Sequence, residues 1–375
     1  MKALLSYVAV FVLVVLSQQI RAACPSPQAD QSIAILGHPF AAEPTPDNCN
    51  LFVSFVDKSG QGALEVFSND NGTFRHFRTV SIAHNSVGGL SLSHNGTLLA
   101  FSAGDVTVLL EVAKLKTSDQ EPIVGVISEG GHGAIIPQFS SDDALLFVSE
   151  ERNSSIAVVE VSTVLANNGR HSPSGQIPVG QGPVGLTVSA DGKHLYATSQ
   201  IVGDGDACQP EQNGGVMHAK GALLTIDVAL AKSNPRRAVA NMVSAGCNPV
   251  RVVVSSDGHS LWVSQRGDGR ILGLDPTYLD SSATKLATSE IVIGGSPVGL
   301  ALRPDGAQLW VASSERFQNT GGRLTLIEPG VATLGQPTKT IQVGRFPRNL
   351  GFMPDGKTLI VTLFGDNAVL LHPTQ

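Results

Sequence analysis

One short turn signal returns at nearly constant spacing along this chain, and it limits the possible folds more than any other feature. The intervals between successive copies are 48, 47, 49, 66, 48 and 50 residues. The seven copies are Asp47-Asn48, Asn95-Gly96, Asp142-Asp143, Asp191-Gly192, Asp257-Gly258, Asp305-Gly306 and Asp355-Gly356. Such dipeptides between apolar runs are typical of β-hairpins, and self-similarity at this period indicates a repeat architecture.

Each repeat contains several short β-type runs. The turn is followed by a run such as LFVS at Leu51, LWVAS at Leu309 or LIVT at Leu359. Two more runs complete the unit, for example IAVVEV from Ile156 and KTIQVG from Lys339. Four short antiparallel strands repeated seven times predict an all-β fold, a seven-bladed β-propeller.

The two ends of the sequence predict how the ring closes. The last repeat ends after NAVLLHPTQ and lacks an outer strand, whereas QSIAILG precedes the first repeat. We therefore expect residues 31–37 to pair with the strand at residues 368–372, which removes the open sheet edge.

Composition and the first residues indicate the compartment and the partners. The chain has 375 residues and a net charge of −6, which argues against a nucleic-acid partner. Lys2 precedes an apolar run, and Ala22-Ala23 offers a cleavage site, so residues 1–23 are predicted to be a secretory signal peptide. Residues 24–375 are then expected to form one propeller domain without a membrane span, a monomer that is secreted or held in the secretory lumen.

Cysteines and glycosylation sequons fit that compartment. The sequons predict glycans at Asn71, Asn95 and Asn153. Four cysteines remain after cleavage, and an even number in an oxidising compartment predicts two disulfides.

The faces of the ring predict which cysteines pair. Cys49 lies just after its turn, and Cys24 precedes a strand that starts from the same face. Cys208 and Cys247 both fall in loops on the opposite face, the channel mouth. The other two connectivities would join opposite faces, beyond the limit of about 7 Å between bridged Cα atoms. We predict Cys24–Cys49 and Cys208–Cys247.

The repeat consensus also resembles a known family. The pattern GxP-x6-PDG-x2-L-x-V-[ST], as in residues 295–313, is similar to the YVTN-type repeat of bacterial, archaeal and fungal propellers, which are related to the lactonase-like propellers. The resemblance covers essentially the whole mature chain and implies the same seven-bladed fold.

Positions counted back from each turn predict the lining of the central channel. Residues three and five positions before the turn are mostly apolar and are expected to pack between blades, whereas those two, four and six positions before it should face the channel. Most of the latter are small. The large polar exceptions are our candidate catalytic residues: Arg251, Asn349, Glu43 and Gln138. An ion pair between Arg251 and Glu43 is the ordinary structural alternative.

The loops at the channel mouth supply candidate substrate-binding residues, because a concave mouth with convergent polar groups is a common ligand site. They are His132, Arg266, Arg345, Arg348 and Gln265. The longest insertion, residues 200–220, accounts for the 66-residue interval and should overhang this mouth, as a lid or as a surface excursion.

Motifs for common catalytic chemistry are missing from the sequence. No metal-binding, phosphate-binding or nucleophile-elbow motif occurs in a suitable context, and the inner columns hold one acid, Glu43. We therefore expect no metal and no cofactor, and a small-molecule substrate.

Three classes of function remain. The first is a metal-free cyclase or pericyclase of secondary metabolism, because positioning alone can lower a barrier; the layout resembles the secreted fungal hetero-Diels–Alderases of tropolone sesquiterpenoid biosynthesis. The second is a lactonase-type hydrolase or a muconate-cyclase-like lyase that uses acid–base groups. The third is a non-catalytic secreted binding propeller.

Overall fold

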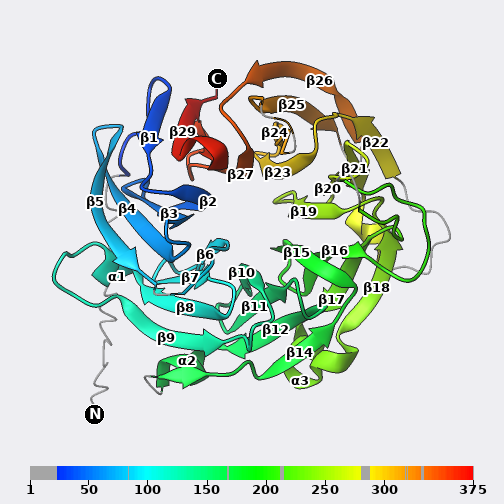
Figure 1. The fold of residues 1–375 in the computed structure, drawn as a ribbon, viewed down its shortest axis with the longest axis horizontal. Helices are drawn as coiled ribbons and strands as arrows, with labels where there is room; N and C mark the ends of the chain where they lie inside the picture. Colours follow the sequence, from blue (N-terminus) through cyan, green and yellow to red (C-terminus); the bar gives the residue numbers. More distant parts are fainter. Residues whose placement is uncertain are drawn as a thin grey trace, which may run out of the picture.

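The structure is a computed structural model that describes residues 23–82, 84–166, 169–211, 215–279, 288–316, 318, 320–330 and 333–374. Within these residues the strands form seven sheets, arranged as blades around a central axis (Figure 1). The prediction of an all-β, seven-bladed propeller is confirmed. Of the predicted signal peptide, residues 1–22 lie outside the described residues.

In each of the first four blades the inner strand comes first in the sequence. Blade 1 contains β2 (His38–Pro44), β3 (Asn50–Val56), β4 (Gly62–Asp70) and β5 (Thr73–Ser81). Blade 2 contains β6 (Leu90–Leu92), β7 (Leu98–Ser102), β8 (Val106–Glu111) and β9 (Ile123–Ser128). Blade 3 contains β10 (Ala134–Phe139), β11 (Leu145–Glu150), β12 (Ser155–Glu160) and β14 (Gly175–Pro178). Blade 4 contains β15 (Gln181–Val188), β16 (His194–Ile201), β17 (Ala222–Asp227) and β18 (Val239–Ser244).

The last three blades complete the circle. Blade 5 contains β19 (Pro249–Val254), β20 (Leu261–Gln265), β21 (Arg270–Leu274) and β22 (Thr288–Val292). Blade 6 contains β23 (Pro297–Leu302), β24 (Leu309–Ser313), β25 (Arg323–Gly330) and β26 (Thr333–Gln342). Blade 7 contains β27 (Pro347–Phe352), β28 (Thr358–Leu363), β29 (Ala368–Pro373) and, from the other end of the chain, β1 (Gln31–Ala34).

Several short elements depart from the plain repeat. β13 (Arg170–His171) pairs in parallel with β9 and gives blade 2 a fifth strand that the repeat did not predict. Three short helices lie between the third and fourth strands of blades 2, 3 and 4: α1 (Val112–Leu115), α2 (Val161–Ala166) and α3 (Val228–Ser233). The 3-10 turns are η1 (Pro235–Arg237), η2 (Pro276–Tyr278) and η3 (Phe364–Asp366).

The repeated turn signal has a clear conformational reason. The second residue of all seven copies has a positive φ, between 57° and 75°. Gly, Asn and Asp tolerate this region best. In blade 3 the Ser140 hydroxyl donates to Asp142 Oδ1 (2.6 Å) and accepts the N–H of Leu145 (2.9 Å), which closes the turn.

The small hydroxyl residues two positions before the turns therefore bond to the turn residues, whereas the sequence predicted that they face the channel. Equivalent bonds to the turn residue occur at Thr45, Ser93, Ser189 and Ser255. Of these residues and Ser140, only Ser93 lines a cavity of the channel. The expectation that this column faces the channel is wrong for the others, because a turn hydroxyl gains more by satisfying local backbone groups.

A second repeated hydroxyl joins neighbouring blades. It is the final Ser or Thr of the L-x-V-[ST] pattern, on the second strand of a blade. In blade 3 the Ser149 hydroxyl accepts the N–H of Ile136 from its own inner strand (3.1 Å) and donates to the carbonyl of Val184 in blade 4 (3.0 Å). The same bridge is made by Ser54, Thr198 and Thr362. These groups are buried, so each bridge satisfies polar atoms between apolar blade faces.

The ring closes as the sequence predicted. β1 pairs with β29, with Gln31 opposite Leu371 and Ala34 opposite Ala368. Ile33 is buried in an apolar cluster that contains residues from β29 and from blade 1, including Val369 and Phe67. Ring closure is therefore stabilised both by the pairing of β1 with β29 and by the burial of Ile33 in the apolar core.

Both predicted disulfides are confirmed. Cys24 and Cys49 are bonded with a Cα–Cα distance of 5.0 Å, and Cys208 and Cys247 with one of 5.7 Å. The first bond lies beside the closing strand β1, and the second connects the 200–220 insertion to blade 5.

We predict that Ile33→Asp opens the ring closure. The side chain of Ile33 is 6% exposed, so an aspartate would bury an unpaired charge against Val369. The free energy of unfolding should fall by about 3 kcal/mol or more, measured by denaturant titration. Ser32→Asp, one residue away on the exposed face of β1, is the matched control and should change stability little. Equal losses in both variants would contradict the account of closure.

Candidate functional site

Irregular strand pairing in the inner strands directs side chains into the channel. In blade 5 the β19–β20 register shifts between Pro249 and Val252, and the N–H of Arg251 bonds to Ser264 Oγ (3.0 Å). In blade 7 the shift lies between Pro347 and Leu350, and the N–H of Asn349 bonds to Thr362 Oγ1 (2.9 Å). A bulge reorients the side chain that it carries. The hydroxyls of Ser264 and Thr362 thus hold the bulges from which Arg251 and Asn349 project.

Three of the four candidate catalytic residues line one cavity. A cavity of about 540 Å³ on the side of the turns is bordered by Glu43, Arg251 and Asn349. Its walls also include Leu92, Leu350 and Phe352 from the columns that were expected to pack only between blades, so the channel is more apolar than predicted. Gln138 is not part of this wall, and its amide donates to the carbonyl of Phe139 (3.2 Å).

Among the described residues, the polar side chains of this cavity have few ion-pair or hydrogen-bond partners. Burial raises the pKa of Glu43 to about 7. No ion pair between Glu43 and Arg251 occurs in the described part of the chain, so the structural alternative of a cross-channel pair is not found. Asn349 Oδ1 accepts the N–H of Ala42 at 3.4 Å.

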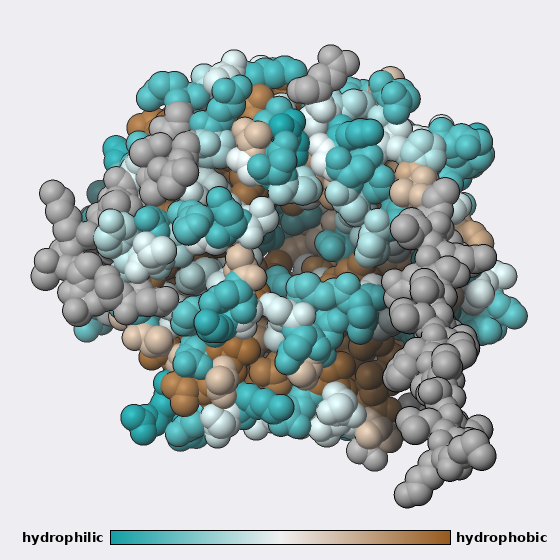
Figure 2. Space-filling view, turned by 180° about the vertical axis from the view of Figure 1, so that it is seen from behind, coloured by the Kyte–Doolittle hydropathy of each residue, from teal (hydrophilic) through white to brown (hydrophobic). Residues whose placement is uncertain are grey.

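A smaller cavity lies toward the mouth and contains a cluster of cations. Its volume is about 190 Å³, and Arg251 borders both cavities. The other charged residues of its wall are Arg266, Arg316, Arg348 and Glu151; the apolar ones are Phe40, Ile135, Val184, Val250, Val298 and Phe346. Figure 2 shows one face of the ring hollowed at its centre, with hydrophilic residues around the opening and hydrophobic residues deeper in.

Two of these arginines have buried nitrogen atoms without a partner. Arg251 Nη1 and Arg348 Nε are both inaccessible to solvent and make no hydrogen bond to any described residue. Burial, and secondly the charge of Arg266, lower the pKa of Arg251 to about 10. Burial, followed by the charges of Arg251 and Arg316, lowers the pKa of Arg348 to about 9. Both groups remain cationic at neutral pH.

Aromatic rings hold Arg348 in place. Its guanidinium carbon lies 4.0 Å from the ring centroid of Phe40, 5.4 Å from that of Phe364 and 5.6 Å from that of Phe346. Such cation–π contacts stabilise a cation without neutralising it. The Arg348 guanidinium is therefore fixed at the cavity while its charge stays available.

The insertion reaches the same cluster. Arg266 Nε pairs with Glu211 Oε1 at 2.7 Å, and Arg266 Nη2 donates to Gln200 Oε1 (2.7 Å). Although burial alone would raise the pKa of Glu211, the hydrogen bond and charge of Arg266 hold it below its usual range. Asn248 Nδ2 donates to the same carboxylate (2.6 Å). With the Cys208–Cys247 bond, these contacts place residues 200–211 over the mouth.

The remaining residues of the predicted mouth do not join this cluster. Arg345 is exposed and pairs with Asp366 (2.7 Å). Gln265 is buried, donates to Glu290 Oε1 (3.2 Å) and lines neither channel cavity. His132 bonds to Glu150 (3.0 Å) in a separate cavity. Of the five, the structure brings only Arg266 and Arg348 to the channel.

Sequence reasoning missed two components of the mouth. Glu211 lies in an insertion without a repeat to compare, and nothing in its local sequence points to Arg266. Phe40 and Phe346 were also missed. Each lies beside a proline at the start of an inner strand, in the sequences HPF and RFPR. Arg316 and Glu151 also line the small cavity, although neither was among the candidate substrate-binding residues.

The three sequons differ in their surroundings. Asn71 and Asn95 are exposed at turns. Asn153 Nδ2, the atom that a glycan would modify, instead donates to Glu150 (3.2 Å) and Ser155 (2.8 Å). Glycosylation of Asn153 would break these bonds, so Asn71 and Asn95 are the better acceptors.

Two searches of the described residues bear on metals and membranes. No group of three or more His, Cys, Asp or Glu side chains in that part of the chain is arranged to hold a metal ion. Among the same residues, no helix has the length and apolar character needed to cross a membrane.

Comparison with known proteins identifies the fold. No protein-family profile and no curated protein matches the sequence. Similar solved structures include Kuenenia stuttgartiensis hydrazine synthase (15% identity, TM-score 0.67, covering 91% of this chain and 96% of that one). The β-propeller domain of Cps50 (Swd1) from Myceliophteria thermophila has 14% identity and a TM-score of 0.68, covering 92% and 100%. A chain of a mitotic checkpoint complex has 12% identity and a TM-score of 0.69, covering 96% and 98%. At these identities the similarity establishes the propeller fold alone.

We predict that the Cys208–Cys247 bond holds the insertion over the mouth. Replacing both cysteines by Ala should lower the free energy of unfolding by about 2–4 kcal/mol. It should also increase protease cleavage within residues 200–220, measured by mass spectrometry after limited digestion. The Cys24→Ala/Cys49→Ala variant is the control: it should lose similar stability without new cleavage there. Unchanged cleavage of the insertion would show that Glu211 and its partners suffice to hold it.

Proposed function

We propose that this chain is a metal-free enzyme of the secretory pathway that binds a small organic anion at the channel mouth and converts it by cyclisation. The observation that carries the proposal is the pair of buried, unpartnered arginine nitrogens, Arg251 Nη1 and Arg348 Nε, at one small cavity. A buried cation without a partner is costly, and functional sites are where such costs persist. The two disulfides fit an oxidising compartment.

The charge balance of the mouth favours an anion. Four arginines border the small cavity, whereas the acidic groups nearby are Glu151 in its wall and Glu211 on the insertion. Arg266 already binds a carboxylate, that of Glu211, in close geometry. A ligand carboxylate or enolate could complete the coordination of Arg251 and Arg348 in the same way.

The apolar walls favour a ligand with a hydrocarbon part. Phe40, Val184 and Val250 face the same space as the guanidinium groups. Such a site can hold a flexible unsaturated molecule in a folded conformation and stabilise negative charge as it develops. These two effects are what a cyclase or pericyclase needs, as in the hetero-Diels–Alderases that the layout resembles.

A second candidate function has one observation in its favour. Glu43, with its pKa raised to about 7 by burial, borders the larger cavity together with Arg251 and Asn349. A carboxyl group that titrates near neutral pH can act as a general base or acid. This arrangement supports a lactonase-type hydrolase or a muconate-cyclase-like lyase.

We predict that the site prefers an anion and that Arg251 provides the preference. Benzoate should bind more tightly than its neutral isostere benzamide, measured by calorimetry at low salt. Arg251→Met should weaken benzoate binding by about tenfold while benzamide is unaffected. Arg270→Met, which removes an exposed arginine paired with Glu290, is the control and should bind benzoate normally. Because Arg251 makes no ion pair with the part of the chain that the structure describes, its variant should be at least as stable as the wild type. A clear loss of stability with unchanged binding would support a structural role.

The mass of the product separates a hydrolase from a cyclase or a cycloisomerising lyase, and the absence of any product indicates a binding propeller. The purified protein is incubated with a metabolite extract of the organism that makes it, and consumed anions are followed by mass spectrometry. A cyclase yields a product of unchanged mass, and a hydrolase yields one heavier by a water molecule. A substrate that disappears with wild type but not with Arg251→Met supports the proposal. Binding of an anion without any product would instead establish a binding propeller.

We predict a pH signature for the second candidate. If Glu43 is a general base, the rate should rise as pH increases through about 7, because only the ionised carboxylate accepts a proton. Glu43→Gln should abolish the rate and the dependence together. A cyclisation that relies on Arg251 and Arg348 should show no step near pH 7 and should survive Glu43→Gln. Folding raises the pKa of Glu43 from its usual value of 4.5 to about 7, so the free energy of unfolding of the wild-type protein should fall as the pH rises from about 4.5 to 7. The Glu43→Gln variant should show a smaller fall over the same range.

A further inference from the structure

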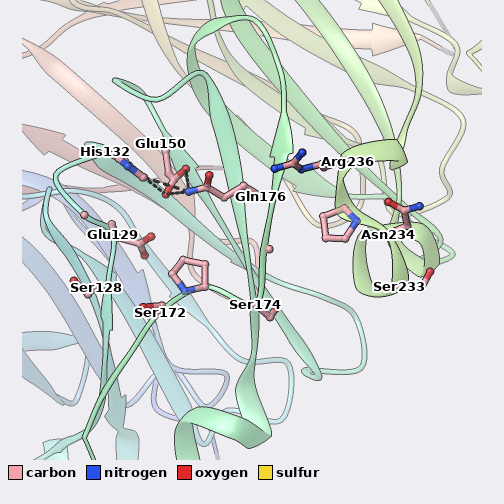
Figure 3. A pocket seen from close by; sticks show the side chains of 14 residues that line it. Ser128, Glu129, His132, Glu150, Ser172, Ser174, Gln176, Ser233, Asn234 and Arg236 are labelled. Carbon is pink, nitrogen blue, oxygen red and sulfur yellow. Dashed lines mark hydrogen bonds and ion pairs between the residues drawn. The ribbon is translucent and has the colours of Figure 1, made fainter.

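A separate cavity of about 680 Å³ lies outside the channel, between the outer parts of blades 2, 3 and 4. Its wall combines the end of β9 and the following loop, the end of β11, the middle of β14 and the segment around η1. Figure 3 shows Glu129, His132, Glu150 and Gln176 gathered at one side of it, with Arg236 and Asn234 coming from a different segment.

One of the two carboxylates in this cavity is fully occupied. Glu150 is completely buried and accepts hydrogen bonds on both oxygens. Oε1 bonds to His132 Nδ1 (3.0 Å) and Gln176 Nε2 (3.2 Å). Oε2 bonds to Asn153 Nδ2 (3.2 Å), to Gln176 Nε2 (3.1 Å) and to the Ser155 hydroxyl. This network fixes a negative charge at the cavity wall.

The other carboxyl group has no such partners. Glu129 is 1% exposed, and among the described residues neither of its carboxyl oxygens makes a hydrogen bond of ordinary geometry. Its polar neighbours are the Thr107 hydroxyl and the Glu150 carboxylate. Burial raises the pKa of Glu129 to about 8; the Thr107 hydroxyl opposes this shift, and the charge of Glu150 adds to it. Other ionisable groups on the surrounding elements are His132, Asp105, Arg152 and Arg236. A buried carboxyl group whose neighbouring donor is a single hydroxyl outside ordinary hydrogen-bond geometry is a costly arrangement.

We propose that this cavity binds the primary ammonium group of a small hydrophilic ligand at Glu129 and Glu150. An ammonium group has three donors and one positive charge, so it can bond to Glu129 and offset the charge that the two carboxylates share. The basic side chains at this cavity do not fill that role: His132 bonds to Glu150, and Arg236 is exposed at η1. The rest of the wall is suited to a hydroxylated ligand, because it contains Ser128, Ser172, Ser174, Ser233 and Asn234.

The test uses two probes that differ in one group. Glucamine carries a primary amine where sorbitol carries a hydroxyl, and calorimetry of the purified protein should show glucamine binding about tenfold or more tightly at pH 8.5. Glu129→Gln should remove this preference. Glu328→Gln, an exposed carboxyl on β25, is the matched control and should retain it. Equal binding of the two probes, no binding of glucamine, or unchanged preference in Glu129→Gln would overturn the proposal.

Proton release provides a readout that needs no variant. Glu129 must lose its proton to accept the ammonium, so glucamine affinity should increase between about pH 6.5 and pH 8.5. At pH 7 the binding enthalpy should change with the ionisation enthalpy of the buffer, because a proton is released. Glu43→Gln tests the location: if that variant, and not Glu129→Gln, abolishes binding, the amine occupies the channel and the proposal fails.

Discussion

A buried hydroxyl bridge between neighbouring blades is the interaction on which the ring depends. Seven sheets that meet only through apolar side chains would leave the backbone of each inner strand without partners wherever it bulges. In five blades the Ser or Thr near the end of the second strand accepts the N–H of the bulge, and at four junctions it also donates to a carbonyl of the next blade. One small side chain thereby satisfies backbone groups in two blades, which explains why the repeat ends in Ser or Thr.

The same bridge makes the functional site possible. A bulge is a local departure from the ladder, and it persists only because the hydroxyl holds its N–H. The bulges of blades 5 and 7 carry Arg251 and Asn349 instead of the small residues Gly185 and Gly299 found elsewhere. The ring can therefore change the chemistry of its channel by exchanging a bulge residue without altering the bonds between blades.

The fold was predictable from sequence because its determinants are local and repeated. A positive φ at the turn, alternating apolar residues and the closing strand all leave a signal within one repeat, and the faces of the ring then gave both disulfides. Comparison between repeats also singled out Arg251, Glu43 and Asn349. Gln138 stood out in the same way and Gln265 was chosen from the mouth loops, but the amides of both bond to nearby groups. The contacts of Glu211 were not predictable, because they depend on how an insertion folds back over the mouth.

The closing strand has a consequence for how the chain is made. β1 leaves the ribosome long before its partner β29, because the Asp30–His372 contact joins residues 342 positions apart. Until β29 has been made, β1 has an unpaired edge and an exposed apolar face. Cys24 and Cys49 are only 25 residues apart, so their bond can form while most of the chain is still being synthesised. That early crosslink keeps β1 beside blade 1, which is the position it occupies in the closed ring. When blade 7 is made, β29 therefore finds its partner strand next to blade 1, so the two ends of the ring need not meet by chance.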